Sequence, residues 1–321
     1  MLGRTSVLLT AVLFCCVFSD LTTAQDPNVL RVITIGDWGE VLFRGQALVA
    51  EQMARWSGEN DPEFILGLGD NIYQWGIFSV DDPQLDRKWR DVYQKNHTEL
   101  ADLQWRLIHG NHDLGFDNGE EWNQVWLTDI EPLWYFPHLW WDFVVEKDDF
   151  SVHFFMIDTE SMRSDTNNHT DMWPWLDNAL STSDADWKIV VGHRDLYAVG
   201  SKGPVNSRLY EQLLPVMEQY GVDVYLCGHD HNLQHIRAID KVPGDVDFVV
   251  NGAGGALWYA FTEEKEVVLR EEYSMEVAFF EMTWGFAPLI ITKDELRFDF
   301  INDEGELIYS FSRTRDDQAP R

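Results

Sequence analysis

The chain has 321 residues, and 24 Lys and Arg against 55 Asp and Glu give it a formal net charge of −31 at pH 7. Hydrophobic residues make up 45% of the chain and include 15 Trp, so a large core can form and disordered and fibrous classes are excluded. The negative charge argues against nucleic acid or an anionic membrane as a partner. An anionic substrate would need a strong local source of positive charge, and this requirement points to bound metal.

The first 24 residues are predicted to be a secretory signal peptide. Arg4 precedes an apolar run over residues 7–18, and small residues at 22–24 offer a cleavage site. This run is too short to cross a bilayer of about 30 Å as a helix. We therefore expect a protein of the secretory pathway, extracellular or in a lysosome-like or vacuole-like compartment, with an uncleaved anchor as the alternative.

The cysteines and two glycosylation motifs fit export. Cys15 and Cys16 would leave with the signal peptide, so Cys227 would be the only thiol of the mature chain and no intramolecular disulfide could form. Sequons at Asn96 and Asn168 are candidate glycan attachment sites. We expect the mature protein to be a monomer.

Apolar runs alternate with helical patterns over the first two thirds of the chain. Buried strands are predicted at 29–35, 64–68, 105–108, 152–157, 187–191 and 222–226. Helices are predicted at 43–56 and around 209–220, where Asn206 or Ser207 is a candidate cap and Pro215 should kink or break the helix. After about residue 235 the helical pattern fades, and strand-like runs follow at 248–250, 277–282, 289–292, 295–300 and 307–311.

This order of elements predicts an α/β fold. Strands alternating with helices indicate a sheet covered on both faces, and the later strands indicate a second, more antiparallel sheet. The sequence has no linker, low-complexity segment or fixed-period repeat. We therefore expect residues 25–321 to form a single domain of two packed sheets with its core at about 29–311, and a separate C-terminal β-domain is the alternative.

Five of the predicted strands end in Gly followed by a residue that can bind metal. These endings are Gly36-Asp37, Gly69-Asp70-Asn71-Ile72-Tyr73, Gly110-Asn111-His112-Asp113, Gly192-His193 and Gly228-His229-Asp230-His231. Ligands of open α/β sheets bind beyond the carboxyl ends of the strands, so these side chains should converge. Oxygen and imidazole ligands without thiolate suit Fe, Mn, Zn or Mg. The ligands are too many for one four-coordinate zinc, and two metals about 3.5–4 Å apart with a shared carboxylate fit better.

Each of these strand endings by itself is weaker evidence for a metal site than the five endings together. A Gly-Asp pair such as Gly36-Asp37 is usually a turn, and His193 alone could be a buried core histidine. The Gly228-His229-Asp230-His231 ending is the most specific, because it brings two imidazoles close together. Five endings of the same kind in one chain favour a metal centre over coincidence.

Together the five endings resemble the motif blocks of the purple acid phosphatases, which belong to the calcineurin-like metallophosphoesterases. The small mammalian-type, tartrate-resistant members are the most similar, and the likeness covers roughly residues 29–255, including 220–234 and 251–255. The resemblance implies a metallophosphoesterase-type sandwich of two mixed β-sheets flanked by helices.

The resemblance also implies a dinuclear centre of Fe(III) and a divalent Fe, Zn or Mn ion. The ferric ion would be held by Asp37, Tyr73 and His231, the divalent ion by Asn111, His193 and His229, and both by a bridging Asp70. In this family a tyrosinate, here at Tyr73, favours ferric iron and gives a purple charge-transfer colour. Relatives without it are usually Mn, Zn or mixed-metal phosphodiesterases.

The function implied is a secreted acid phosphatase that acts on small phosphate monoesters. The two cations would orient the phosphate and lower the pKa of a bound water far below about 15.7, so that a metal-bound hydroxide attacks phosphorus in line. His112 is the candidate for phosphate contact and leaving-group protonation, with Asp113 orienting its ring; a structural role for His112 is the alternative. Lys202 replaces a further family histidine, and it can bind phosphate but is a poorer proton donor at acidic pH.

Two other features depart from the family, and two other functions stay open. Arg194-Asp195 replaces an aromatic-proline pair, and residues 160–174 lack the cysteine-closed regulatory loop of the mammalian proteins. One alternative is a metallophosphodiesterase or nucleotide pyrophosphatase on the same scaffold, against which Tyr73 argues. The other is a non-catalytic secreted binding protein that uses Trp134-Tyr135 or Trp140-Trp141, although these Trp are expected to pack in the core or line the site entrance.

Overall fold

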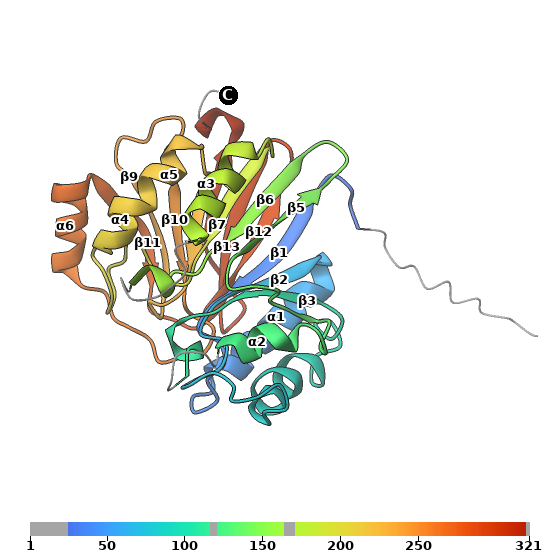
Figure 1. Ribbon diagram of the computed structural model, residues 1–321. Coiled ribbons are helices and arrows are strands. Elements are labelled where there is room, and N and C mark those ends of the chain that lie inside the picture. The colour runs from blue at the N-terminus through green and yellow to red at the C-terminus, as the bar shows by residue number, and fades with distance from the viewer. Residues whose placement is uncertain (1–24, 116–120, 164–170, 319–321) are drawn as a thin grey trace, which may run out of the picture.

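The computed structural model describes residues 25–115, 121–163 and 171–318. The predicted signal peptide, the sequon at Asn168 and part of the 160–174 segment lie outside the described residues. The strands of the described part form two mixed sheets of seven strands each, and helices lie on the outer faces of the sheets (Figure 1). This arrangement confirms the predicted fold class.

The first sheet combines the N-terminal strands with the last three strands of the chain. Its order is β14 (Leu307–Thr314), β13 (Glu295–Asn302), β12 (Gly285–Ile291), β1 (Leu30–Ile35), β2 (Phe64–Leu68), β3 (Gln104–Ile108) and β4 (Trp134–Tyr135). Strands β1 to β4 run parallel to one another, and β12 pairs antiparallel with β1. The carboxyl ends of β1, β2 and β3 therefore lie at one edge of the sheet.

The second sheet is parallel at its centre and antiparallel at both sides. Its order is β11 (Met275–Glu281), β9 (Leu233–Ala238), β10 (Asp247–Asn251), β8 (Val224–Cys227), β7 (Trp187–Val191), β6 (Ser151–Met156) and β5 (Trp141–Glu146). Strands β6, β7, β8 and β10 are the parallel set. Their alternating side chains separate two cores, since Ile189 and Leu226 face the first sheet while Val190 and Tyr225 face the outer helices.

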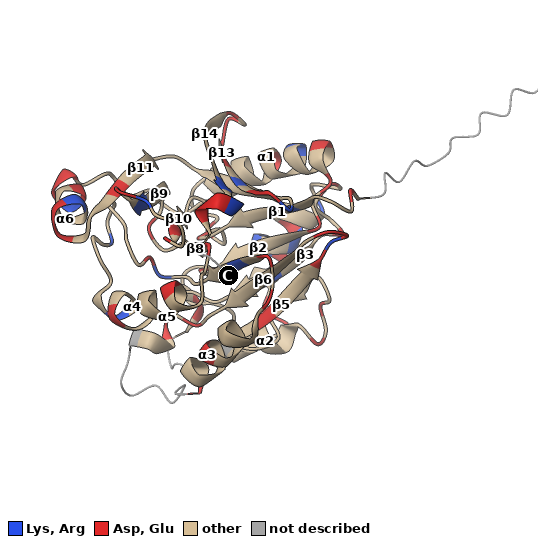
Figure 2. Ribbon diagram, turned by 90° about the horizontal axis from the view of Figure 1, so that it is seen from above, with Lys and Arg blue, Asp and Glu red and all other residues tan. Residues whose placement is uncertain are grey.

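The helices cover the outer faces of the two sheets. They are α1 (Gly45–Asn60), η1 (Asp86–Gln94), α2 (Glu121–Leu127), α3 (Met172–Thr182), α4 (Ser207–Gln212), α5 (Leu214–Gln219) and α6 (Glu263–Tyr273), with single turns η2 (Asn111–Asp113), η3 (Ser161–Arg163) and η4 (Arg315–Asp317). Figure 2 shows acidic positions on α1, α3, α4 and α6 alike, so the negative charge is spread over several helices. No helix within the three described ranges has the length and apolar character needed to cross a membrane.

Several local predictions are confirmed. The helical pattern of 209–220 divides at Leu213 into α4 and α5, with Pro215 in the first turn of α5. Asn206 caps α4, because its side chain accepts a hydrogen bond from the Leu209 backbone N–H. Cys227 is buried and free.

The Trp-rich segments pack inward, as expected. Trp134 and Trp141 are 0% and 6% exposed and belong to the core between the sheets. Tyr135 and Trp140 are half-buried against the same core. These side chains therefore contribute packing and offer no large exposed aromatic surface for recognition.

Two predictions about the C-terminal third are wrong. The strands after residue 235 do not form a sheet of their own, since β12, β13 and β14 extend the first sheet and β9, β10 and β11 extend the second. Pairing of β12 with β1 covers an otherwise open sheet edge. The chain also forms the helix α6 beyond residue 235; this helix buries only Leu269 fully and therefore has no periodic apolar stripe that would have revealed it.

Candidate metal centre

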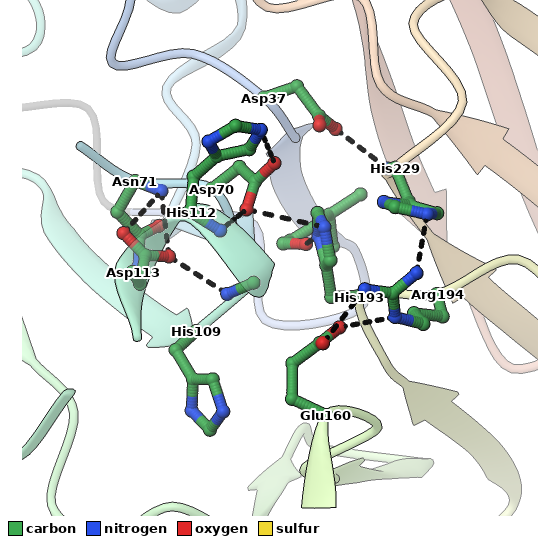
Figure 3. A network of polar contacts seen from close by, with 12 residues as sticks. Asp37, Asp70, Asn71, His109, His112, Asp113, Glu160, His193, Arg194 and His229 are labelled. Carbon is green, nitrogen blue, oxygen red and sulfur yellow. Dashed lines mark hydrogen bonds and ion pairs between the residues drawn. The ribbon is translucent and has the colours of Figure 1, made fainter. Parts of the chain in front are cut away.

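The five Gly-containing endings meet at the carboxyl ends of β1, β2, β3, β7 and β8 (Figure 3). Two groups of potential ligands share Asp70, one with His193 and His229 and one with Asp37 and His231. Within each group the ligand atoms lie within 4.8 Å of one another, and all these side chains are buried. The shared carboxylate is the arrangement that a bridging ligand requires.

The backbone conformation at three of the predicted ligands directs their side chains into the site. Asp37, Asp70 and His229 all have left-handed backbone conformations, with φ of 57°, 51° and 68°. Such conformations are costly for residues other than Gly and concentrate at functional sites. Gly110 allows the close approach of two loops, because a Cβ at this position would lie 2.3 Å from Asp70 Oδ1 and 2.7 Å from His193 Cε1.

One half of the centre is built around Tyr73. The phenol oxygen donates to Asp37 Oδ1 at 2.9 Å or to Asp70 Oδ2 at 3.0 Å, and lies 3.2 Å from His231 Nε2. His231 Nε2 is 3.2 Å from Asp37 Oδ1. Tyr73 therefore contacts each of the three other side chains predicted around ferric iron.

Two of the three predicted histidine ligands are oriented for metal binding. His193 Nδ1 donates to the Leu68 carbonyl at 2.9 Å, and His231 Nδ1 donates to the Leu257 carbonyl at 2.7 Å. Each contact leaves Nε2 unprotonated in the neutral ring and aimed at the carboxylates, which is the tautomer that a metal requires. His193 Nε2 lies 3.4 Å from Asp70 Oδ1.

The second half of the centre also fits a metal ion by its unsatisfied atoms. Asn111 Oδ1 and His193 Nε2 are buried and have no well-aligned hydrogen-bond partner. Buried polar atoms of a folded protein are nearly always satisfied, so both atoms are available to a metal ion, His193 Nε2 after it has lost its proton. A carboxamide oxygen, an imidazole and a carboxylate suit a divalent Fe, Zn or Mn ion.

The charges of the pocket demand a cation. Burial opposes charge on His193, yet the carboxylate of Asp70, reinforced by Asp37, raises its pKa to about 10. Burial also opposes charge on Asp70, and His193 and His112 nevertheless hold its pKa well below the usual range. Burial raises the pKa of Tyr73 far above its ordinary value, and Asp37 and Asp70 raise it further. Bound metal would take over the positive charge that a proton on His193 supplies here.

His112 lies at the mouth of the centre, but Asp113 does not orient it. The His112 side chain is 34% exposed, and its Nε2 lies 4.0 Å from Asp70 Oδ2. Its Nδ1 contacts the Gln74 carbonyl at 3.0 Å. The Asp113 carboxylate instead accepts backbone N–H groups of Asn71, Ile72 and Gly110 and the Gln124 amide. The predicted ring-orienting role of Asp113 is therefore wrong, because this buried carboxylate ties the loops after β2 and β3 together.

Lys202 lies near the metal centre and contacts Tyr259, an aromatic residue that packs on His231. Its ammonium nitrogen lies 5.4 Å from the ring centroid of Tyr259, in cation–π geometry. Tyr259 stacks on His231, with ring centroids 4.3 Å apart. The predicted contact of Lys202 with phosphate stays a prediction.

Sequence reasoning did not assign a site role to Arg194, Glu160 or the segment around Tyr259. Arg194 follows His193 directly and contacts both Glu160 and His229 (Figure 3). The Arg194-Asp195 pair, which departs from the family pattern, was the one sequence signal that could have pointed to Arg194. No comparable signal marked the Leu257 carbonyl or Tyr259, which the Gly-rich exit of β10 brings against His231.

Comparison with known proteins agrees with this geometry. Residues 30–233 match the profile of the calcineurin-like phosphoesterases, and the chain belongs to this family of metallophosphoesterases. Within the family it is 32% identical to purple acid phosphatase 17 of Arabidopsis thaliana over 73% of this chain and 71% of that protein. It is 28% identical to human tartrate-resistant acid phosphatase type 5 over 87% and 89% of the two chains. The predicted family is confirmed, and so is the predicted enzyme class of acid phosphatases.

Solved structures extend the likeness to the whole fold. The GAP50 protein described as the anchor in the inner membrane complex of Plasmodium matches with a TM-score of 0.76, at 24% identity and over 89% of each chain. The purple acid phosphatase PPD1 of yellow lupin matches with a TM-score of 0.66, at 18% identity and over 91% of this chain and 56% of that one. At these identities the two structures support the sandwich fold alone.

Proposed function

We propose that the protein is an exported acid phosphatase that hydrolyses small phosphate monoesters at a centre of Fe(III) and a divalent Fe, Zn or Mn ion. The observation that carries the proposal is the position of Tyr73, whose phenol lies within 3.2 Å of three other candidate ligands. Asp70 is the carboxylate available to both ions. The anionic substrate is opposed by the net charge of −31, so binding depends on the local cations.

The protein side chains would hold the ligands in place, keep bulk water from the buried carboxylates and donate a proton to the leaving group. When bound, the two ions would supply positive potential for the phosphate and acidify water so that it can attack phosphorus at acidic or neutral pH. His193 and His231 are held by backbone carbonyls and need no reorientation. Burial of Asp37 and Asp70 keeps bulk water away from their carboxylates. His112 is the partly exposed imidazole from which the departing alcohol would take a proton.

The metal content and the substrate preference of the purified protein test the proposal. We expect two metal ions per chain, a visible absorption band and faster turnover of an aryl phosphate monoester than of the corresponding diester. The matched Tyr73→Phe variant should keep the fold and lose the visible band, because it lacks the phenolate. Preference for the diester would instead support the metallophosphodiesterase alternative.

Export is tested separately, by sequencing the N-terminus of the secreted protein. We expect this N-terminus to lie near Gln25.

The role of His112 predicts an effect that depends on the leaving group. An Asn at this position cannot donate the proton, so His112→Asn should lower kcat for an alkyl phosphate by about 10²-fold or more. Nitrophenolate leaves without protonation, and the loss for nitrophenyl phosphate should be much smaller. Paired kinetics with the two substrates measure the difference. Equal losses for both substrates would show that His112 acts in binding or structure.

A further inference from the structure

Arg194 is held rigidly between a carboxylate and a predicted metal ligand. Its Nε and Nη2 donate to the two oxygens of Glu160 at 2.7 and 2.9 Å, and its Nη1 lies 2.8 Å from His229 Nε2. The Arg194 and Glu160 side chains are 12% and 2% exposed. The backbone N–H of Arg194 donates to Thr159 Oγ1 at 3.0 Å, and its carbonyl accepts the hydroxyl of Tyr225 at 2.6 Å. The guanidinium is therefore fixed at both ends (Figure 3).

The contact between Arg194 and His229 fixes the protonation of the imidazole. A guanidinium has five donors and no acceptor, and it does not deprotonate in proteins. His229 Nε2 must therefore accept with its lone pair. The proton of the neutral ring then sits on Nδ1, the nitrogen that faces His193 in Figure 3.

Metal binding by His229 is incompatible with this contact at either ring nitrogen. At Nε2, the metal would need the lone pair that Arg194 Nη1 already occupies at 2.8 Å. At Nδ1, the metal would move the proton to Nε2, and two N–H groups would then face each other. A fixed positive charge beside the ligand also repels an incoming cation. The arrangement differs from His193 and His231, whose outer nitrogens donate to carbonyls and support binding.

From this conflict we infer that Arg194 competes with the divalent ion for His229 and so weakens the second metal position relative to the first. The inference rests on the proposed dinuclear centre and concerns only its second half. Loading of the ion held by Asn111, His193 and His229 requires Nη1 of Arg194 to leave His229. Because the guanidinium is a rigid plane, this step requires either the whole group to shift against Glu160 or the His229 ring to move away from it.

The competition is measured by metal affinity. Protein carrying one equivalent of iron is titrated with Zn²⁺, and the dissociation constant and stoichiometry are read by calorimetry and elemental analysis. Arg194→Met keeps much of the length and removes the charge and the donors. We expect Zn²⁺ to bind about 10- to 100-fold more tightly, the range over which contacts to metal-binding histidines tune affinity. The visible band of the first half should not change.

Three further variants separate competition from other effects. Arg194→Lys keeps the positive charge but cannot bind Glu160 and His229 together as the guanidinium does, so its Zn²⁺ affinity should lie between those of the wild type and Arg194→Met. The double variant Glu160→Gln, Arg194→Met avoids an unpaired buried carboxylate and should show the same gain as Arg194→Met. Arg237→Met removes a cation from an exposed pair with Glu276, and Zn²⁺ affinity should be unchanged.

The outcomes distinguish this inference from the proposed function. Two equally tight metal ions in the wild type and in both Arg194→Met proteins would overturn the inference and leave the dinuclear phosphatase intact. A single ion in every variant, including Arg194→Met, would overturn both. Weak Zn²⁺ binding in the wild type that becomes tight in the double variant would support both.

Discussion

Asp70→Asn is expected to remove both metal ions and nearly all phosphatase activity. Asp70 is the one carboxylate common to both ligand groups, and the carboxamide keeps its size while it removes the charge. Loss of the ions removes several kcal/mol of transition-state stabilisation, and about 4 kcal/mol corresponds to roughly 10³-fold in rate. Elemental analysis and kcat/KM on one preparation measure the two losses together.

Asn111→Ala is the matched control for Asp70→Asn. Asn111 Oδ1 is predicted to bind only the divalent ion, so this variant should keep the iron and the visible band while it loses the second ion. Melting temperatures of both variants show whether the fold survives. An Asp70→Asn protein that retained two ions and wild-type turnover would exclude a bridging role for this carboxylate.

The site could be predicted because each ligand residue comes shortly after a strand in the sequence. Buried parallel strands are short continuous apolar runs, and the runs at 64–68 and 187–191 coincide with β2 and β7. A Gly and a ligand-type side chain after such a run place the side chain at the carboxyl edge without further information. The convergence of Asp37 and Asp70 needed only the order of β1 and β2 in the first sheet, whereas His231 follows β8 of the second sheet and also depends on how the two sheets pack.

Contacts that depend on side-chain rotamers or on distant strands could not be predicted in this way. β12 pairs with β1 from the other end of the chain, and nothing in an alternating apolar pattern names the partner strand. The contact of Arg194 with His229 crosses between the loops after β7 and β8 and depends on one rotamer. Asp113 has the residue type and spacing of a histidine partner, but its carboxylate turns to backbone N–H groups instead.

The largest effect on stability is expected at Arg313, which joins the two sheets. Arg313 lies in β14 of the first sheet, is 1% exposed, and pairs with Asp223 at 3.1 Å and with Asp247 of β10 at 2.9 Å. Its other donors bind the carbonyls of Asp245 and Asp317. Removing one partner of a buried ion pair costs about 3–5 kcal/mol, so Arg313→Met should lower the free energy of unfolding by this amount. Urea unfolding at pH 7 measures the loss.

The pH dependence of this loss identifies its cause. Burial raises the pKa of Asp223, and Arg313 is the main group that opposes this rise. Without Arg313 the pKa of Asp223 rises further in the folded state, so the variant gains stability from protonation as the pH falls toward that value. The difference between Arg313→Met and the wild type should therefore shrink from pH 7 to pH 5. Adding Asp223→Asn should recover much of the loss at pH 7, because the uncompensated charge is then gone; a difference that is constant with pH and unaffected by Asp223→Asn would attribute the loss to packing alone.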